Sequence, residues 1–223
     1  MAGTFITFEG PDGAGKTSVL TALMPELAPH LAQAVRLTRE PGGAAISEQI
    51  RQVILDPQNG AMDARTEALL YAASRRQHLA EVIQPALARG EVVICDRFVD
   101  SSVAYQGAGR GIGEEAVLAM NQFATAGLTP ALTLYLDVPS AVGLARIQAH
   151  RTGQYDRLDQ EQLAFHERVR AAYLRLAQAH PDRIVTIDAT QSMTTVVAAC
   201  LAQLHRFFLV APGRLKRKRR KFL

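Results

Sequence analysis

The sequence predicts an α/β domain with a parallel central sheet and helices on both faces, a three-layer sandwich. Short apolar runs alternate with longer segments of helical periodicity, which is the pattern of repeated βαβ units. The apolar runs are continuous rather than alternating, as in strands buried on both faces. The chain has 223 residues, 48% of them hydrophobic and 21% charged, which suits one large globular domain.

The first half of the chain supplies three of the expected strands. The first is β-branched and aromatic and runs directly into glycines, while the third is a compact apolar run. Between them, leucine, isoleucine and valine recur at helical spacing. The expected elements are strands at 4–9, 34–38 and 91–95, and helices over 16–28, after residue 43 and over 62–88, the last as one or two helices.

The second half repeats the alternation. Two further apolar runs predict strands at 131–136 and 183–187, and apolar stripes at 165–176 and 197–204 predict helices. We expect one domain over about 1–208, followed by a basic tail at 209–223. In a parallel sheet the ligand site lies beyond the carboxyl ends of the strands, so functional residues are expected directly after the strands.

Composition excludes several other classes of protein. The formal net charge is +4, but seven of the basic residues lie in the last ten positions, so the rest of the chain is mildly acidic. Cys95 and Cys200 are too few for a disulfide framework, and no Cys/His spacing suggests zinc. The sequence shows no apolar run of membrane-spanning length and no signal peptide after Met1, so we expect a cytoplasmic protein.

A phosphate-binding loop follows the first strand and opens the first helix. Its eight residues fit the pattern G-x-x-x-x-G-K-[ST], in which backbone N–H groups surround phosphate oxygens. The lysine reaches the β- and γ-phosphates and the threonine hydroxyl binds Mg²⁺. The loop predicts a P-loop NTPase-type fold but is shared by GTPases, motors and kinases. Its residues are Gly10, Pro11, Asp12, Gly13, Ala14, Gly15, Lys16 and Thr17.

Charged residues also follow the second and third strands. Arg39 begins the run R-E-P-G-G, and Asp96 and Arg97 begin a segment that continues as S-S-V-A-Y-Q-G from residue 101. Two arginines at neighbouring strand ends can hold a second phosphate dianion. Asp96 has the position of a Walker-B acid that binds Mg²⁺ directly or through water.

These motifs, in this order and spacing, resemble thymidylate kinases of the bacterial type. The similarity extends from Thr4 to about Phe208 and rests on F-E-G-P-D-G-A-G-K-T, R-E-P-G-G, D-R-F and S-S-x-A-Y-Q-G. It implies transfer of the γ-phosphoryl group of ATP to dTMP, giving dTDP, with Mg²⁺ as the metal. It also implies a homodimer, for which segments 62–88 and 114–126 carry apolar surface.

The resemblance implies a role for each motif residue. Tyr71 stands where the family usually has a Phe stacked on thymine, and Tyr105 is expected under the deoxyribose. The expected catalytic residues are Asp12, Lys16, Arg97 and Arg151. Arg146 is expected near the adenine of ATP, which the phosphate loop binds. The residues expected to bind dTMP are Asp12, Arg39, Pro41, Tyr71, Arg75, Arg97, Ser102, Tyr105 and Gln106, with Arg75 on a base carbonyl and Ser102 and Gln106 on the base edge.

A short lid is expected at about 146–159, because this segment is polar, contains glycine and lies between helices. The phosphate loop has no arginine, so the lid should supply the cation for the transferring phosphoryl group. Arg151 is the first candidate and Arg157 the second. Asp159 stands where the family usually has Glu, so its acid is one methylene shorter. The six histidines are expected at the surface, and Glu9 is expected to anchor the loop.

Two other classes of function stay open from the residues. One is a different phosphate-acceptor kinase, against which the two arginines, R-E-P-G-G and A-Y-Q-G argue. The other is a nucleotide-binding protein without turnover, or a nucleic-acid-associated one that uses the basic tail. The intact set of Lys16, Thr17, Asp96 and the arginines disfavours loss of catalysis. Nucleic-acid binding is not expected beyond weak contacts of the tail.

Overall fold

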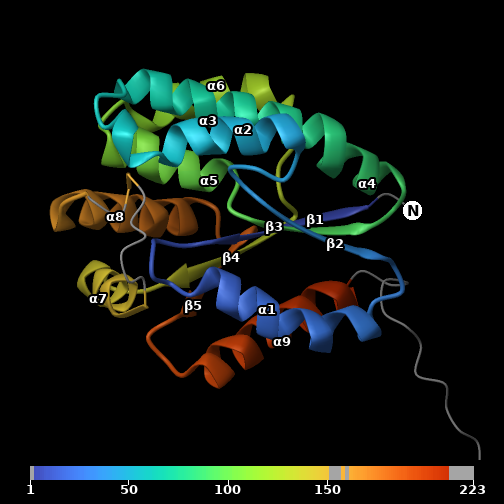
Figure 1. Cartoon of the computed structure of the whole chain (residues 1–223). Helices are drawn as coiled ribbons and strands as arrows, with labels where there is room; N and C mark the ends of the chain where they lie inside the picture. The colour runs from blue at the N-terminus through green and yellow to red at the C-terminus, as the bar shows by residue number, and fades with distance from the viewer. Residues whose placement is uncertain (1–2, 151–156, 159–160, 211–223) are drawn as a thin grey trace, which may run out of the picture.

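One parallel sheet of five strands lies at the centre of the protein (Figure 1). The computed structural model describes residues 3–150, 157–158 and 161–210. The strand order is β2-β3-β1-β4-β5. The strands are β1 (Thr4–Glu9), β2 (Val35–Arg39), β3 (Val92–Asp96), β4 (Leu132–Asp137) and β5 (Ile184–Asp188). Because β1 lies between β3 and β4, the loop that follows β1 emerges at the middle of the carboxyl edge, where α/β folds bind ligands.

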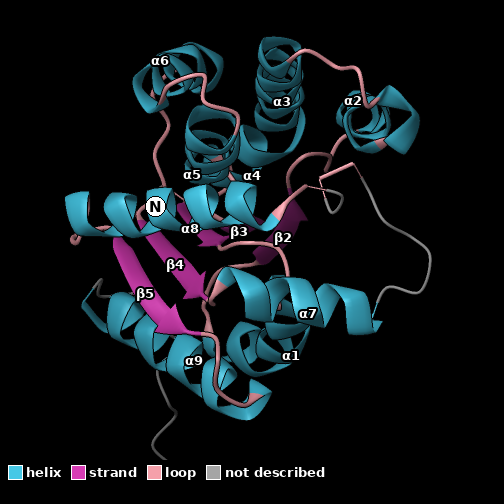
Figure 2. Ribbon diagram, turned by 90° about the vertical axis from the view of Figure 1, so that its left-hand side faces the viewer, coloured by secondary structure: helices cyan, strands magenta, loops and turns pink. Residues whose placement is uncertain are grey.

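Helices cover both faces of the sheet and make the other two layers (Figure 2). In Figure 1, α1 and α9 lie below the sheet and α2 to α6 lie above it. The helices are α1 (Lys16–Leu27), α2 (Ala45–Leu55), α3 (Ala64–His78), α4 (Gln84–Ala88), α5 (Val99–Ser102), α6 (Glu114–Thr125), α7 (Ser140–His150), α8 (Leu163–Ala179) and α9 (Met193–Val210). Short 3₁₀ turns η1 (Ala28–His30) and η2 (Pro57–Asn59) and π-helical segments η3 (Leu79–Ile83) and η4 (Val103–Gly109) complete the described elements. None of the described helices is long and apolar enough to cross a bilayer.

Side chains of the strands alternate between two apolar cores. Ile6 and Phe8 of β1 are buried with α1 and α9 on one face. Phe5 of β1, with Val93 and Cys95 of β3, is buried against η3 and α4 on the other. A third cluster packs α8 against η4 and the strands β4 and β5. The sheet is therefore covered on both faces, as its continuous apolar strands predicted.

Four strands begin and end one residue later than predicted. The predicted strands end at residues 38, 95, 136 and 187, whereas β2, β3, β4 and β5 end at Arg39, Asp96, Asp137 and Asp188. Their polar ends still belong to the ladder, because Arg39 pairs in register with Asp96, and Asp137 with Asp188. The difference has a functional consequence, since Arg39 and Asp96 are held by the sheet rather than by a loop.

The predicted helical segment 62–88 is continuous but not uniform. Asp63 accepts hydrogen bonds from the N–H groups of Arg65 and Thr66 and so caps α3. The π-helical segment η3 separates α3 from α4, whose second residue is Pro85. Proline lacks an N–H group and its ring crowds the carbonyl four residues earlier, so a wider turn before it avoids that clash.

Candidate active site

A cavity of about 600 Å³ opens at the carboxyl edge of the sheet. Residues of the phosphate loop and residues expected to bind dTMP line the same cavity, although they are far apart in the sequence. Leu158 of the expected lid also lines it. The predicted site residues in its wall are Asp12, Gly13, Ala14, Gly15, Lys16, Thr17, Arg39, Pro41, Tyr71, Arg75, Asp96, Arg97, Ser102, Tyr105, Gln106 and Arg146.

The phosphate loop curls around the Lys16 ammonium group. Lys16 Nζ donates to the carbonyl oxygens of Gly10 at 2.9 Å and Pro11 at 3.1 Å. Gly10 and Pro11 belong to the loop but do not line the cavity. Burial, followed by repulsion from Arg97, lowers the pKa of Lys16 to about 8. A Cβ on Gly13 would lie 2.1 Å from the carbonyl oxygen of Gly143, so α7 packs directly on the loop. The loop therefore holds one cation ready for an anionic ligand.

Thr17 and Asp96 form a small oxygen-rich corner beside Lys16. The Thr17 hydroxyl lies 3.2 Å from Asp96 Oδ2 and donates to it. The other carboxylate oxygen, Asp96 Oδ1, is buried and has no hydrogen-bond partner within the described part of the chain. Mg²⁺ prefers oxygen ligands of this kind. An acceptor oxygen left without a donor next to a hydroxyl fits a cation site, so the donor set suits the metal.

Arg97 connects the phosphate loop to the opposite wall of the cavity. Its guanidinium donates to the carbonyl oxygen of Gly10 at 3.0 Å and to Asp12 Oδ1 at 2.6 Å, both in the loop. It also donates to the hydroxyls of Ser101, Tyr105 and Tyr173, and it lies over the Tyr105 ring. Arg97 has a φ of 72°, a left-handed backbone that non-glycine residues seldom adopt outside constrained sites.

Asp12 and Tyr105 complete this contact between the walls. Tyr105 donates its hydroxyl proton to Asp12 Oδ2 at 2.7 Å. Burial alone would raise the pKa of Asp12, but the charges of Arg97 and Lys16 outweigh it and hold the pKa below its usual value. Asp12 therefore carries a negative charge between two cations.

Glu9, the last residue of β1, anchors the segment that carries Arg97. Its buried carboxylate accepts hydrogen bonds from the N–H of Phe98 at 2.7 Å, from the Ser101 hydroxyl and from the Tyr173 hydroxyl at 2.9 Å. Burial, with a further contribution from the charge of Asp100, raises the pKa of Glu9 to about 7. Glu9 therefore anchors the turn after β3, whereas it was expected to anchor the phosphate loop.

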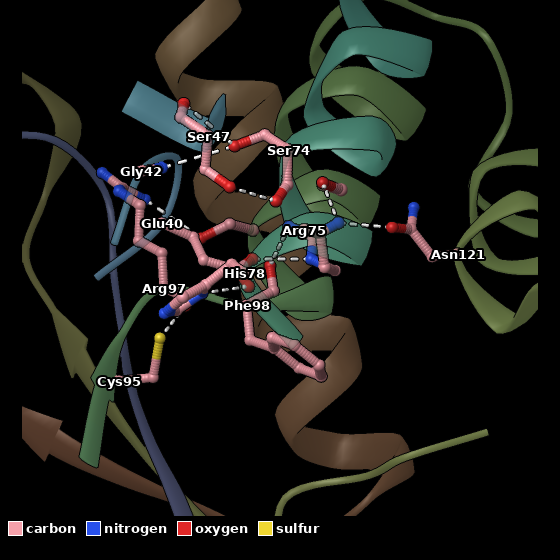
Figure 3. Close-up of polar contacts among 12 residues, drawn as sticks. Glu40, Gly42, Ser47, Ser74, Arg75, His78, Cys95, Arg97, Phe98 and Asn121 are labelled. Carbon is pink, nitrogen blue, oxygen red and sulfur yellow. Dashed lines mark hydrogen bonds and ion pairs between the residues drawn. The ribbon is translucent and has the colours of Figure 1, made fainter. Parts of the chain in front are cut away.

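Arg75 is buried beneath the acceptor side of the cavity, with 2% of its surface exposed (Figure 3). Its Nε donates to Glu40 Oε2 at 2.7 Å. Its Nη1 donates to the Ser102 hydroxyl and to Asn121 Oδ1, and its Nη2 to the carbonyl oxygen of Phe98. One arginine thus links α3 to the loop after β2, to α5 and to α6.

Gln106 and Tyr71 lie in the same wall. Gln106, in the π-helical segment η4, donates to Glu67 Oε1 of α3 at 2.8 Å. Glu67 is fully buried, also accepts from Arg110, and pairs with Arg157. Tyr71 of α3 packs on the apolar cluster formed by α8 and η4. The wall is thus built from aromatic rings and amide groups held by a buried carboxylate.

The remaining predicted arginines differ in their placement. Arg39 is 51% exposed at its side chain and pairs with Glu48 at 3.0 Å. Arg146 donates to the carbonyl oxygens of Ala189 at 3.0 Å and Gly13 at 3.4 Å. Arg157 turns instead to Glu67 and to the carbonyl oxygen of Ile54, and does not line the cavity. Arg151, Asp159 and the basic tail from residue 211 onward lie outside the described residues.

Several residues of the site were not identified from the sequence. Glu40 stands inside R-E-P-G-G but received no role, and Glu67, Asn121 and Tyr173 were not singled out. Their partners lie tens of residues away, so no local pattern marks them. A glutamate among apolar neighbours in helix α3, as Glu67 is, was the one available signal.

The expectation that all histidines lie at the surface is wrong for two of them. His78 is 0% exposed and His166 is 2% exposed. His78 lies 3.1 Å from Glu40 Oε1 and 2.7 Å from the Thr38 hydroxyl, which provide the polar partners that a buried imidazole requires. The ring of His166 lies edge-on to Phe165.

Comparison with known proteins gives one consistent result. The sequence model of the thymidylate kinase family matches residues 8–200. The thymidylate kinase of Lacticaseibacillus casei (strain BL23) is 71% identical over 209 residues, covering 93% of this chain and 98% of its own. That of Latilactobacillus sakei subsp. sakei (strain 23K) is 69% identical over 212 residues, covering 93% and 99%. The crystal structure of thymidylate kinase from Ehrlichia chaffeensis is similar with a TM-score of 0.72 at 30% identity, covering 92% of this chain and 99% of that one.

Proposed function

The chain belongs to the thymidylate kinase family and phosphorylates dTMP with ATP to give dTDP, and from that premise we propose how its residues divide the work. The observation that carries the proposal is the position of Arg97. It is bound both to the phosphate loop and to the tyrosines of the acceptor wall. A phosphate held by Arg97 would therefore lie next to the phosphates held by the loop, as in-line transfer requires.

The phosphate loop, residues 10–17, binds the triphosphate of ATP. Lys16 exchanges its two carbonyl contacts for β- and γ-phosphate oxygens, and the loop N–H groups surround the rest. The Arg146 guanidinium links the loop to the carbonyl oxygen of Ala189 and lines the cavity, which suits contact with the adenine. The loop thus orients the γ-phosphoryl group toward the acceptor.

Thr17 and Asp96 hold Mg²⁺, Thr17 by its hydroxyl and Asp96 by the carboxylate whose Oδ1 has no partner among the described residues. When bound, the metal supplies positive charge to the phosphate oxygens during transfer. Asp96 is fixed for this task because it belongs to the β3 ladder.

The opposite wall binds dTMP, with Arg39 and Arg97 on its phosphate. Asp12 and Tyr105 meet the sugar, Asp12 at the 3′-hydroxyl. Tyr71 and Pro41 flank the base, and Arg75, Ser102 and Gln106 meet its polar edge. Support comes from their common cavity and from the donors they present. The phosphate displaces Asp12 from part of Arg97, which frees one carboxylate oxygen for the sugar.

We further propose a single kinase domain over 1–208, a cytoplasmic setting and a basic tail at 209–223 without a role in the reaction. The first two residues of that predicted tail, Leu209 and Val210, continue helix α9. Arg151 is proposed as the lid cation that neutralises the transferring phosphoryl group, and Asp159 as the acid of the same lid segment. Arg157 is proposed to tie the end of the lid segment to Glu67 instead, as their ion pair supports.

A homodimer through α3 and α6 is also proposed. These helices lie side by side on the outer layer (Figures 1 and 2) and expose large apolar side chains, Leu69 at 59%, Leu118 at 42% and Phe123 at 92%. Burying such side chains between copies is favourable. Light scattering after size exclusion should give a dimer, and Phe123→Asp a monomer. Leu209→Asp changes an exposed side chain of α9 and is the control, which should stay dimeric. A wild-type monomer would refute the proposal.

The division of work is tested by acceptor and metal dependence together. In a coupled assay with ATP, we expect dTMP to be phosphorylated faster than dUMP, CMP, AMP or GMP. Asp96→Asn should raise the Mg²⁺ concentration needed for half-maximal rate by about tenfold or more, since it removes one charged ligand. Asp188→Asn, at the end of the edge strand β5, should not. An unchanged Mg²⁺ requirement for Asp96→Asn would place the metal elsewhere.

A further inference from the structure

Arg75 uses most of its hydrogen-bonding capacity on the protein. A guanidinium group has five N–H donors. Four of them meet acceptors within the described part of the chain, namely Glu40, Ser102, Asn121 and the carbonyl oxygen of Phe98. The remaining donor is on Nη2, and Arg75 lines the cavity. One N–H group is therefore left for a ligand, and its direction depends on how the other four are held.

Glu40 is the carboxylate that pairs with Arg75. Its Oε2 accepts from Arg75 Nε at 2.7 Å, and both side chains are 2% exposed. Its Oε1 lies 3.1 Å from His78 Nδ1. A carboxylate only accepts hydrogen bonds, so the proton in this second contact belongs to His78 Nδ1. His78 thereby fixes the rotation of the carboxylate that holds Arg75 (Figure 3).

His78 is itself held from its other side. The Thr38 hydroxyl lies 2.7 Å from His78 Nε2, and Thr38 is the residue before Arg39 in β2. Gly43 has a φ of 85°, and a Cβ there would lie 2.5 Å from His78 Nε2. The imidazole therefore fills the space beneath the loop that follows β2, and no side chain can be added at Gly43 without displacing the ring.

A metal site is the competing reading of this cluster. Glu40, His78 and Cys95 bring one ligand atom each to within 4.8 Å of one another. However, both ring nitrogens and both carboxylate oxygens already have hydrogen-bond partners. Burial raises the pKa of the Cys95 thiol well above its usual value, which disfavours the thiolate that a metal needs. The cluster is better suited to orienting Arg75 than to binding an ion.

We propose that His78 and Glu40 are positioning residues that orient Arg75 toward the base of dTMP, so that they set acceptor affinity and base selectivity rather than the rate of transfer. The inference rests on the proposed contact between Arg75 and a base carbonyl. A correctly aimed N–H donor favours a carbonyl and rejects an amino group at the same place. Loosening Arg75 should therefore weaken dTMP binding and narrow the preference for dTMP over dCMP.

Two substitutions of His78 separate orientation from packing. In His78→Asn the amide nitrogen can take the place of Nδ1 and donate to Glu40, whereas in His78→Gln it takes the place of Nε2 and meets Thr38. We expect His78→Gln to raise the KM for dTMP by about tenfold, the worth of one hydrogen bond to a charged group. It should narrow the ratio of kcat/KM between dTMP and dCMP. His78→Asn should stay within about threefold of the wild type.

In both variants kcat and the KM for ATP should change less than about twofold, and thermal unfolding should show that both are folded. Equal KM values for the two variants, or a loss confined to kcat, would overturn the proposal. Arg75→Lys separates failure of the positioning proposal from failure of its premise, the contact between Arg75 and the base of dTMP. If Arg75→Lys leaves the KM for dTMP unchanged, Arg75 does not meet the base. If it raises that KM while both His78 variants match the wild type, only the positioning role is wrong.

Discussion

The two halves of the cavity are built in different ways. The phosphate half, residues 10–17, is one contiguous loop in which Lys16 is held by backbone carbonyls. The acceptor half is assembled from β2, α3, β3, α5 and η4, and buried carboxylates hold these elements together. Glu40 holds Arg75, Glu67 holds Arg110 and Arg157, and Glu9 anchors the turn that carries Arg97.

This difference separates two ways to recognise phosphate-bearing ligands. A loop of backbone N–H groups can bind any triphosphate, because it contacts only phosphate oxygens. Side chains from several elements can also recognise a sugar and a base. Each buried charge among them then needs a fixed partner. We therefore expect selectivity for the acceptor to depend on residues beneath the cavity as much as on those that line it.

Arg97→Ala should give the largest effect, because the Arg97 guanidinium contacts both the phosphate loop and the tyrosines of the acceptor half. We expect kcat to fall by about 10³-fold, as when a donor to the transferring group is removed. The Kd for ATP, measured by calorimetry, should change less than about threefold. Arg36→Ala is the control, because it removes a half-exposed arginine of β2 that does not line the cavity. An equal loss of ATP affinity would assign Arg97 to the phosphate half.

Glu67→Gln tests whether buried carboxylates support the acceptor half. The change leaves Arg110 and Arg157 without their buried anion, so the free energy of unfolding should fall by about 3 kcal/mol. The KM for dTMP should rise several-fold through Gln106, while the Kd for ATP should stay constant. Glu161→Gln removes the more exposed partner of Arg110 and should lower stability by about 1 kcal/mol or less. Equal losses from both variants would contradict the distinction.

The pH dependence of ATP binding tests the phosphate half. The pKa of Lys16 is lowered to about 8, chiefly by burial. An anionic ligand favours the charged amine, so above pH 8 binding must take up a proton and the Kd should rise. Between pH 7.5 and 9 we expect roughly a tenfold increase by calorimetry. The Kd for dTMP should change less, since arginines do not titrate here. In Lys16→Met the pH dependence should disappear; if it persists, another group titrates.

Deletion of residues 212–223 should have the smallest effect, because none of the motif residues assigned to either half lies in this segment. We expect kcat and both KM values to stay within about twofold of the full chain in the coupled assay. Leu209→Asp is the control for a change near the end of α9 that leaves the tail in place. A tenfold loss of activity on deletion would show that the tail contributes to the enzyme.

The phosphate half could be predicted from the sequence almost completely, because its residues are adjacent and each has one task. All five strands were also predicted, although four of them begin and end one residue later than predicted, so that each ends on a polar residue. A boundary chosen by apolar content stops before Arg39 and Asp96, while the backbone ladder includes them.

The acceptor half could be predicted only in part. Motif resemblance identified the residues that line the cavity, such as Tyr71 and Arg75. It did not identify Glu67, whose partners Gln106 and Arg157 come from distant segments, or the burial of His78. Arg157, expected to serve the transferring group, lies in that ion pair instead. These contacts depend on how the elements pack, which no local spacing encodes.

The two cysteines have a practical consequence for following this enzyme in solution. Both Cys95 and Cys200 are free and buried, and burial raises the pKa of each thiol, that of Cys200 to about 12. Native thiols in this state react slowly with maleimides. A cysteine introduced at Leu209, which is exposed on α9 outside the proposed dimer surface, would therefore carry a fluorophore or spin label at a single site per chain, without prior removal of the native thiols.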